Sequence, residues 1–220
     1  MALDPRAQVA FDQGHVFAKA NDWVAAVRSF LTCVSFAPDY VNGWYNLMCS
    51  HIHNGEREKA LGAGQRALAI NPKFPNLKFC LANLTSEMDR VSDSVEYFLQ
   101  AIEDEPQHMQ CHILLGNLFE KMKMFEEAYE CFDNALRLGG ERSTLYSAMI
   151  YQAGHSGRFD LAHIAGLGLK REFKAGRNHA APFQLFCYEA STRGSQLAAS
   201  AQHWNKTVPA NIPQLSKRDS

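Results

Sequence analysis

The chain has 220 residues, 46% of them hydrophobic and 20% charged, which suits one domain or a compact array with a short appendage. Its formal net charge of −1 gives no overall attraction to nucleic acid or to an anionic membrane. No apolar run reaches the roughly 18 residues that cross a bilayer, and the N-terminus, with Asp4 and Asp12, lacks the apolar core of a signal peptide.

Prolines that end predicted helices recur at a fixed interval. The segment FLTCVSFAPDYVNGWYNL, residues 30–47, reads as a helix that stops at Pro38 before a second apolar run. Pro72 and Pro106 stand in the same setting, and both intervals are 34 residues (72 − 38 and 106 − 72). Proline lacks a backbone donor and clashes with the preceding turn, so each one marks a helix end. A period of this size predicts a repeat architecture.

Five repeats follow when these prolines are placed at position 32 of a 34-residue repeat. After a lead-in at residues 1–6, the repeats are residues 7–40, 41–74, 75–108, 109–142 and 143–176. Position 20 holds a small residue in every repeat: Ala26, Ala60, Ser94, Ala128 and Ala162. A turn segment divides each repeat, and Gly55 and Gly157 suit a left-handed helix cap there. Asp22 and Glu56 suit the start of a second helix. Each repeat is therefore predicted to be a helix, a tight turn and a second helix.

The pattern of small and large residues resembles the tetratricopeptide repeat family over residues 7 to about 174. Small residues let two antiparallel helices approach closely, and large apolar residues fill the space beside them. The resemblance implies an all-α fold, a right-handed superhelical solenoid of about five helix-turn-helix repeats with a C-terminal capping segment. It also implies that the first helices line a concave groove. The alternative is a generic helical bundle with an accidental period.

A stripe of amides and aromatic rings is predicted on the first helices. If positions 4, 7, 8 and 11 face the core, positions 2, 5, 9 and 13 share another face. Carboxamides can pair with any peptide backbone, and aromatic rings add apolar contact area. These residues are therefore expected to line the groove and hold an extended partner segment: Gln8, Phe11, His15, Asn42, Tyr45, Asn76, Phe79, Asn83, Gln110, Asn117 and Lys121. Alternatively, they are ordinary solvated helix residues, with the aromatics partly buried between repeats.

After about residue 176 the repeat register is lost. Residues 177–204 are predicted to form capping helices, and residues 205–220 a flexible tail. The stretch from Ala181 to Trp204 resembles the segment after the repeats in SPINDLY-type proteins, relatives of O-linked N-acetylglucosamine transferase. That family grips substrate peptides with an asparagine ladder at position 6, and here Asn46 fits this ladder and joins the candidate groove residues. The other position-6 residues depart from it: Asp12, Cys80, Leu114 and Ala148.

Sites of chemistry are not expected in this sequence. Among the nine histidines, His51 and His53 diverge on a helix, and His108 and His112 straddle the turn at Pro106, so no metal site is predicted. Phosphate-binding glycine loops and nucleophile motifs are absent from the sequence, so we expect no cofactor and no catalytic centre. The six scattered cysteines form no C-x-x-C pair, which indicates free thiols and a cytoplasmic location.

These features predict a non-catalytic scaffold or adaptor that binds a protein or peptide partner in the concave groove. No nucleic acid and no membrane insertion are expected. An alternative is the substrate-recognition region of a SPINDLY-like O-linked glycosyltransferase that lacks its catalytic domain. A third possibility is self-association through the ends of the solenoid.

Overall fold

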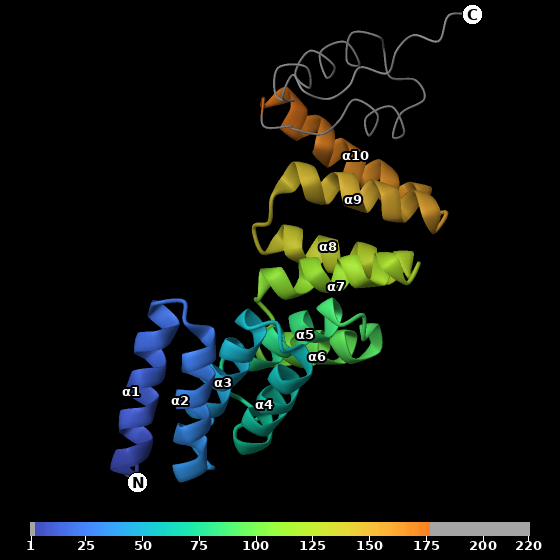
Figure 1. Ribbon diagram of the computed structural model, residues 1–220. Helices are drawn as coiled ribbons and strands as arrows, with labels where there is room; N and C mark the ends of the chain where they lie inside the picture. Colours follow the sequence, from blue (N-terminus) through green and yellow to red (C-terminus); the bar gives the residue numbers. More distant parts are fainter. Residues whose placement is uncertain (1–2, 177–220) are drawn as a thin grey trace, which may run out of the picture. The chain divides into compact units, whose positions relative to one another are not determined.

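The computed structural model describes residues 3–176, which form ten α-helices and no β-strand (Figure 1). The predicted all-α architecture of paired helices is confirmed. The predicted cap, residues 177–204, and tail, residues 205–220, lie outside the described residues. The helices are α1 (Pro5–Lys19), α2 (Trp23–Phe36), α3 (Val41–His53), α4 (Arg57–Ile70), α5 (Leu77–Glu87), α6 (Val91–Asp104), α7 (Met109–Lys121), α8 (Phe125–Arg137), α9 (Arg142–His155) and α10 (Phe159–Lys174).

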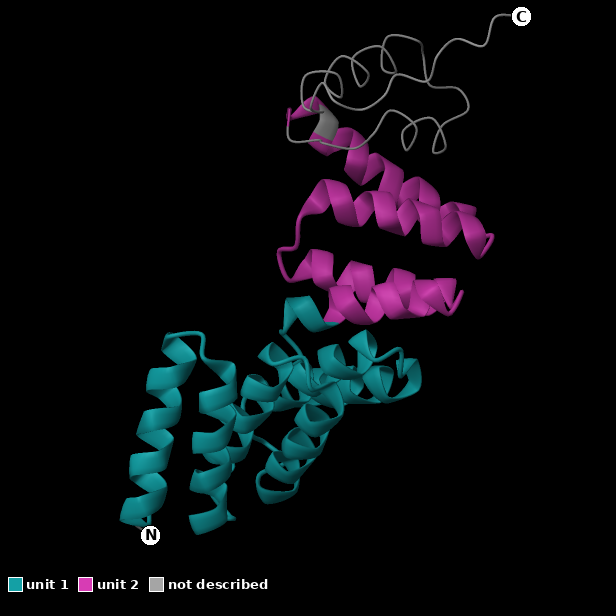
Figure 2. Cartoon of the chain, viewed as in Figure 1, with its two compact units in different colours: residues 1–111 teal, residues 112–220 magenta. Residues whose placement is uncertain are grey.

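The chain divides into two compact units, residues 1–111 and 112–220, and the division falls within α7 (Figure 2). In unit 1, each helix from α1 to α6 packs against the next one along the chain. In unit 2, α8 packs on α9 and α9 on α10. Packing between sequential helices is what a repeat architecture requires, since each repeat contacts its neighbours. None of the helices in residues 3–176 combines the length and the apolar character that a membrane crossing requires.

The three periodic prolines end helices as predicted. The helices α2, α4 and α6 each stop two residues before a proline, at Phe36, Ile70 and Asp104. The first helix begins at Pro5, where Asp4 caps it by accepting a hydrogen bond of 2.8 Å from the Arg6 backbone N–H. Proline at the first position of a helix has no donor to satisfy, so this start is favourable.

The turn within each helix pair repeats one backbone conformation every 34 residues. The second residue after the first helix has a positive φ of 58° to 76° in all five turns: Asn21, Gly55, Asp89, Lys123 and Gly157. The next residue's N–H then bonds back over the helix end, for example from Glu56 to the carbonyl of His51 at 2.9 Å. This is the Schellman pattern, which satisfies the free carbonyls of a helix end. The predicted left-handed caps at Gly55 and Gly157 are confirmed.

Complementary side-chain volumes pack the two helices of a pair together. In the first repeat a Cβ at Gly14 would lie 2.6 Å from the ring of Phe30. The second repeat reverses the sizes, because a Cβ at Gly64 would lie 2.6 Å from Sδ of Met48. One small and one large residue thus share each of these contacts, which lets the two helices of the pair pack closely.

The small residues at position 20 fill the closest helix approaches. Ala26, Ala60, Ser94 and Ala128 are fully buried, whereas Ala162 is partly exposed. Ser94 could not be buried without a partner for its hydroxyl. Its Oγ donates a hydrogen bond of 2.7 Å to the carbonyl of Ala82 on the other helix of the pair.

Candidate functional site

The aromatic residues of the predicted groove are half-buried in contacts between helices. Phe11 packs edge-on against Phe30 and Tyr40, with ring centroids 5.8 and 5.2 Å apart. Tyr45 lies 5.1 Å from the Phe74 ring, and its hydroxyl is 3.8 Å from Sγ of Cys80. These rings therefore stabilise the helix packing and leave only part of their surface for a partner.

His15, another of the predicted groove residues, is half-buried beside the same aromatic cluster. Its ring lies edge-on against Phe11 and Phe30, with centroid separations of 4.5 and 5.5 Å. The imidazole thus forms part of the packing between α1 and α2.

The predicted amides fall into two groups by their hydrogen bonds. Gln8 and Asn46 are engaged within their own helices: Nε2 of Gln8 donates to Asp12 Oδ1 at 3.0 Å, and Nδ2 of Asn46 donates to the carbonyl of Asn42 at 2.8 Å. Nδ2 of Asn42 lies 3.5 Å from the Tyr40 hydroxyl, the outer limit of a hydrogen bond. The second group has side chains that make no hydrogen bond with any residue in the range 3–176: Asn76, Asn83, Gln110 and Asn117. Their donors and acceptors remain available to a partner.

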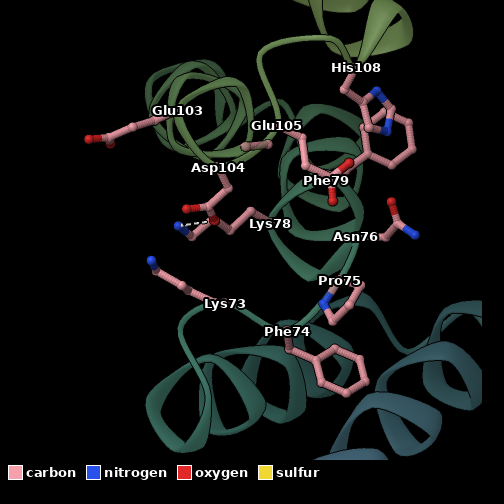
Figure 3. Close-up of a pocket in the computed structure, with 11 residues that line it drawn as sticks. Lys73, Phe74, Pro75, Asn76, Lys78, Phe79, Glu103, Asp104, Glu105 and His108 are labelled. Carbon is pink, nitrogen blue, oxygen red and sulfur yellow. Dashed lines mark hydrogen bonds and ion pairs between the residues drawn. The ribbon is translucent and has the colours of Figure 1, made fainter.

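One hollow of unit 1 brings two of the predicted residues together, Asn76 and Phe79 (Figure 3). It has a volume of about 330 Å³ and is bordered by the turn before α5, the start of α5 and the chain after α6. The ring of Phe79 packs on the ring of His108 with centroids 4.8 Å apart, on the side of the hollow near Asn76. The lining residues are Lys73, Phe74, Pro75, Asn76, Lys78, Phe79, Ala101, Glu103, Asp104, Glu105 and His108.

Charged side chains of both signs line this hollow, and two of them form an ion pair with each other. Nζ of Lys78 lies 2.6 Å from Oδ2 of Asp104, and both side chains are partly buried (15% and 31% exposed). The other charged lining residues are Lys73, Glu103 and Glu105. Because positive and negative charges are mixed, the hollow is a poor site for a phosphate or a metal ion. A polar peptide backbone suits the mixture of amide, aromatic ring and charge better.

Unit 2 has a hollow of about 680 Å³ that brings together two further predicted residues, Asn117 and Lys121. Two residues of α9, Tyr151 and His155, border it as well. They occupy positions 9 and 13 of the fifth repeat, as Asn117 and Lys121 do in the fourth. The remaining lining residues are Glu120, Lys123 and Phe125.

The polar wall of this second hollow is fixed by a buried amide. Nε2 of Gln152, a fully buried side chain, donates a hydrogen bond of 2.7 Å to Oε2 of Glu120. Among residues 3–176, its Oε1 has no hydrogen-bond partner. The carboxylate of Glu120 is therefore held in one orientation.

A seam of contacts joins successive repeats, and sequence reasoning missed it. At three of the junctions, position 17 of one repeat contacts position 13 of the next. Trp23 stacks on His53 with centroids 4.1 Å apart, and Phe125 stacks on His155 at 4.8 Å. Between the second and third repeats the same positions form an ion pair, Nε of Arg57 and Oε2 of Glu87 at 3.4 Å. The two histidines thus have a packing role. The 34-residue spacing of these pairs was the signal that could have revealed them.

The thiols among the described residues are free and weakly acidic. Cys33, Cys111 and Cys131 are buried, and Cys49 and Cys80 are half-buried. Burial raises the pKa of Cys49 to about 11 and that of Cys131 to about 12. Thiolates are the reactive form, so these cysteines are poor nucleophiles near neutral pH. Within residues 3–176, no group of three or more His, Cys, Asp or Glu is arranged to hold a metal ion.

No family model matches the chain. Among curated proteins it is 25% identical over 93 residues to the tetratricopeptide repeat-containing protein trd-1 of Caenorhabditis elegans (42% of this chain, 12% of that protein). It is 28% identical over 150 residues to the human protein O-mannosyl-transferase TMTC3 (66% and 16%). It is 29% identical over 115 residues to the UDP-N-acetylglucosamine–peptide N-acetylglucosaminyltransferase of Giardia intestinalis (47% and 8%). The chain therefore spans less than a fifth of the length of these relatives.

Solved structures with the same arrangement of helices include MamA. A crystal structure of MamA protein has a TM-score of 0.69 at 15% identity and covers 80% of this chain and 97% of MamA. Residues 41 to the end of MamA from Desulfovibrio magneticus RS-1 give a TM-score of 0.67 at 12% identity (82% and 100%). At such identities the likeness shows the fold. Together with the paired helices, the 34-residue turns and the sequence likeness to trd-1, it shows a fold like that of tetratricopeptide-repeat proteins.

Proposed function

We propose that this chain is a non-catalytic interaction protein that holds a segment of a partner protein along the faces of its first helices. One observation carries the proposal. In unit 2, positions 9 and 13 of two successive repeats border the same hollow, through Asn117, Lys121, Tyr151 and His155. Residues that recur at fixed repeat positions and face one open space form a continuous surface, which suits a chain-like ligand.

In each unit, the amides at first-helix positions favour an extended polypeptide. Asn76, Asn83, Gln110 and Asn117 have no hydrogen-bond partner for their side chains among the described residues. A carboxamide offers a donor and an acceptor, which matches the alternating carbonyl and N–H groups of a peptide backbone. The half-buried aromatic rings beside them add apolar area with little loss of side-chain entropy.

Replacing Asn76, Asn83 and Asn117 together with Ala tests the proposal. A partner is first captured with the intact chain, and its affinity for the intact chain and the variant is measured by calorimetry. Each lost contact is worth ~1 kcal/mol, so the triple variant should bind about a hundredfold more weakly. Gln65 on α4 and Asn134 on α8 are exposed amides of second helices, and replacing both with Ala is the matched control. Equal affinity of the triple variant and the control would contradict the proposal.

A second candidate function is substrate recognition for an O-linked sugar transferase. It is favoured by the relatives, since TMTC3 and the Giardia protein are both transferases. On this proposal the partner held by the groove is a transferase substrate. Mass spectrometry of the captured partner would then find hexose or N-acetylhexosamine on Ser or Thr of the bound segment. An unmodified segment that binds equally well favours the plain scaffold.

A further inference from the structure

A separate groove in unit 1 lies between the second helices of the first two repeats. It has a volume of about 570 Å³, which is within the usual range for a binding cleft. We call it the α2/α4 groove, because α2 and α4 form its walls and α3 its floor. Its lining residues are Val24, Val27, Arg28 and Leu31 of α2, Trp44, Leu47 and His51 of α3, Asn54, Glu56, and Lys59, Gly62, Ala63 and Arg66 of α4.

The apolar part of the α2/α4 groove is preformed and open to solvent. Val24 is 49% exposed and Leu31 46% exposed, so water covers apolar side chains that a partner would bury. Trp44 is held in place, because its Nε1 donates a hydrogen bond of 2.8 Å to the carbonyl of Pro38. His51, which is 5% exposed, is fixed by Oε2 of Glu56 at 2.7 Å from its Nδ1.

The rim of the groove carries unneutralised positive charge. Arg28 on one wall and Arg66 on the other form no ion pair with any residue in the described range. The guanidinium of Arg66 instead lies 5.8 Å from the centre of the Trp44 ring. Nζ of Lys59 lies 2.5 Å from Oε1 of Glu56, so these two charges neutralise each other. Two arginines flanking an apolar floor favour an acidic ligand.

The lining residues of each wall recur at the spacing of one helix face, which suits packing against another helix. On α2 the lining residues fall at 24, 27, 28 and 31, and on α4 at 59, 62, 63 and 66, so both walls are stripes spaced by three, four and seven residues. Each stripe spans two turns, about 10 Å at the helical rise. Gly62 leaves a gap between them, because a Cβ there would meet no atom within 4 Å. A ligand side chain can enter this gap.

We propose that the α2/α4 groove docks an amphipathic α-helix of a partner protein, with apolar residues at i, i+3, i+4 and i+7 and acidic residues on both flanks. This mode places an apolar helix face in a groove and pairs the flanking charges with the rim. Residues 177–220 do not fit the description, since they carry five basic residues and only two acidic ones (Arg177, Arg193, Lys206, Lys217 and Arg218 against Glu189 and Asp219). None of its lining residues is a residue of the proposed function, so the two sites are separate.

Gly62→Leu gives a sharp test, because it fills the groove while the fold is retained. The new side chain has free space, and Leu is a better helix former than Gly. Gly154→Leu is the matched control, since Gly154 is also a helical glycine whose added Cβ would meet no atom within 4 Å. A display library of helical peptides, with apolar positions fixed and all others random, is selected on the full chain, and the enriched peptides are synthesised. Their affinity is measured by fluorescence anisotropy for the full chain and for each variant.

The expected result is enrichment of peptides with acidic flanks. Their binding should weaken by about tenfold or more with Gly62→Leu and with the double variant Arg28→Glu/Arg66→Glu, and should be unchanged by Gly154→Leu. Binding should also weaken at high salt, because the rim charges are exposed. The Asn76/Asn83/Asn117 triple variant should bind these peptides normally, which separates this proposal from the proposed function.

Four results would overturn the proposal. One is enrichment of neutral or basic peptides, and another is equal binding by the Gly62→Leu variant. The third is a wild-type dimer in sedimentation analysis that Gly62→Leu makes monomeric, because a second copy of the chain would then occupy the groove. The last is Gly62-dependent binding to phosphatidylserine vesicles, which would assign the groove to a membrane surface.

Discussion

Gly116 has no side chain because the ring of Phe132 occupies the space where one would lie. A Cβ on Gly116 would be 2.7 Å from Cε1 of Phe132, and that ring is only 2% exposed. Gly14 and Phe30 repeat this relation in the first repeat, where the corresponding distance is 2.6 Å. In the second repeat the large side chain belongs to Met48 on the first helix, and the glycine is Gly64 on the second. The size of one residue therefore sets what its partner can be.

Gly116→Ala should lower the free energy of unfolding, because the buried Phe132 ring has to shift to admit the methyl group. We expect a loss of about 1–3 kcal/mol, the usual cost of overpacking a core. Gly62→Ala should instead raise stability by about 0.5–1 kcal/mol, since its Cβ meets no neighbour and Ala is the better helix former. Urea unfolding monitored by circular dichroism measures both changes.

A double-mutant cycle shows whether the ring is the cause. Phe132→Leu frees space beside residue 116, so the double variant Gly116→Ala/Phe132→Leu should lose less stability than the sum of the two single losses, by ~0.5–3 kcal/mol. Strict additivity would mean that the glycine is required for some other reason.

Glu56 links the end of α3 to the start of α4. It stands at the N-cap of α4, where its side chain makes no capping hydrogen bond to the backbone. Instead Oε1 lies 2.5 Å from Nζ of Lys59 and Oε2 lies 2.7 Å from Nδ1 of His51. Hydrogen bonds from Lys59, Asn54 and His51 lower the pKa of Glu56 to about 2. Asp22, by contrast, caps α2 directly by accepting a hydrogen bond of 3.0 Å from the Ala25 backbone.

The contribution of Glu56 to stability should depend on pH in a definite direction. Its folded pKa of about 2 is below the ordinary value of 4.5, so the stabilisation is fully present above pH 4.5 and is lost as the pH falls toward 2. Glu56→Gln should therefore be less stable than wild type at pH 7, and the difference should vanish near pH 2. Urea midpoints measured across this pH range test the expectation. Glu103→Gln, at an exposed carboxylate, is the control, and an equal pH response of the two variants would contradict the assignment.

The helices and turns could be predicted from the sequence because their signals are local. Prolines two residues after α2, α4 and α6, and glycines such as Gly55 with positive φ, act through the backbone of their own segment. Side-chain partners across repeats depend on rotamers and on the register between helices, so one pair of positions gives a ring stack at Trp23 and His53 but an ion pair at Arg57 and Glu87.

The candidate site was predictable in part for the same reason. Of the residues predicted from repeat positions, Asn117 and Lys121 border one hollow, and Asn76 and Phe79 border another. They could not show that the side chain of Asn46 is used within α3, or that the ring of Phe11 is half-buried. Tyr151 and His155 occupy the same repeat positions as Asn117 and Lys121, so the sequence pattern also pointed to them.

Contacts between sequential helices determine how far a local destabilising substitution affects the stability of unit 1. Each helix from α1 to α6 packs on the next, so stability is the sum of repeat terms and neighbour terms. Such a chain can open at one end while distant helices stay folded. A core built around one centre would instead lose protection everywhere at once.

Phe30→Leu should therefore loosen one end of unit 1 and leave the other unchanged. Phe30 is 1% exposed and packs against Phe11 and His15 between α1 and α2, so the smaller side chain leaves a cavity there. Hydrogen exchange followed by mass spectrometry should show faster exchange of amides in α1 and α2 and unchanged exchange in α5 and α6. Phe98→Leu is the reciprocal variant, because Phe98 is equally buried on α6 and contacts Phe79 on α5. It should speed exchange in α5 and α6 and spare α1. If either substitution accelerated exchange uniformly from α1 to α6, the unit would unfold as a single block, and repeat-by-repeat stability would be ruled out.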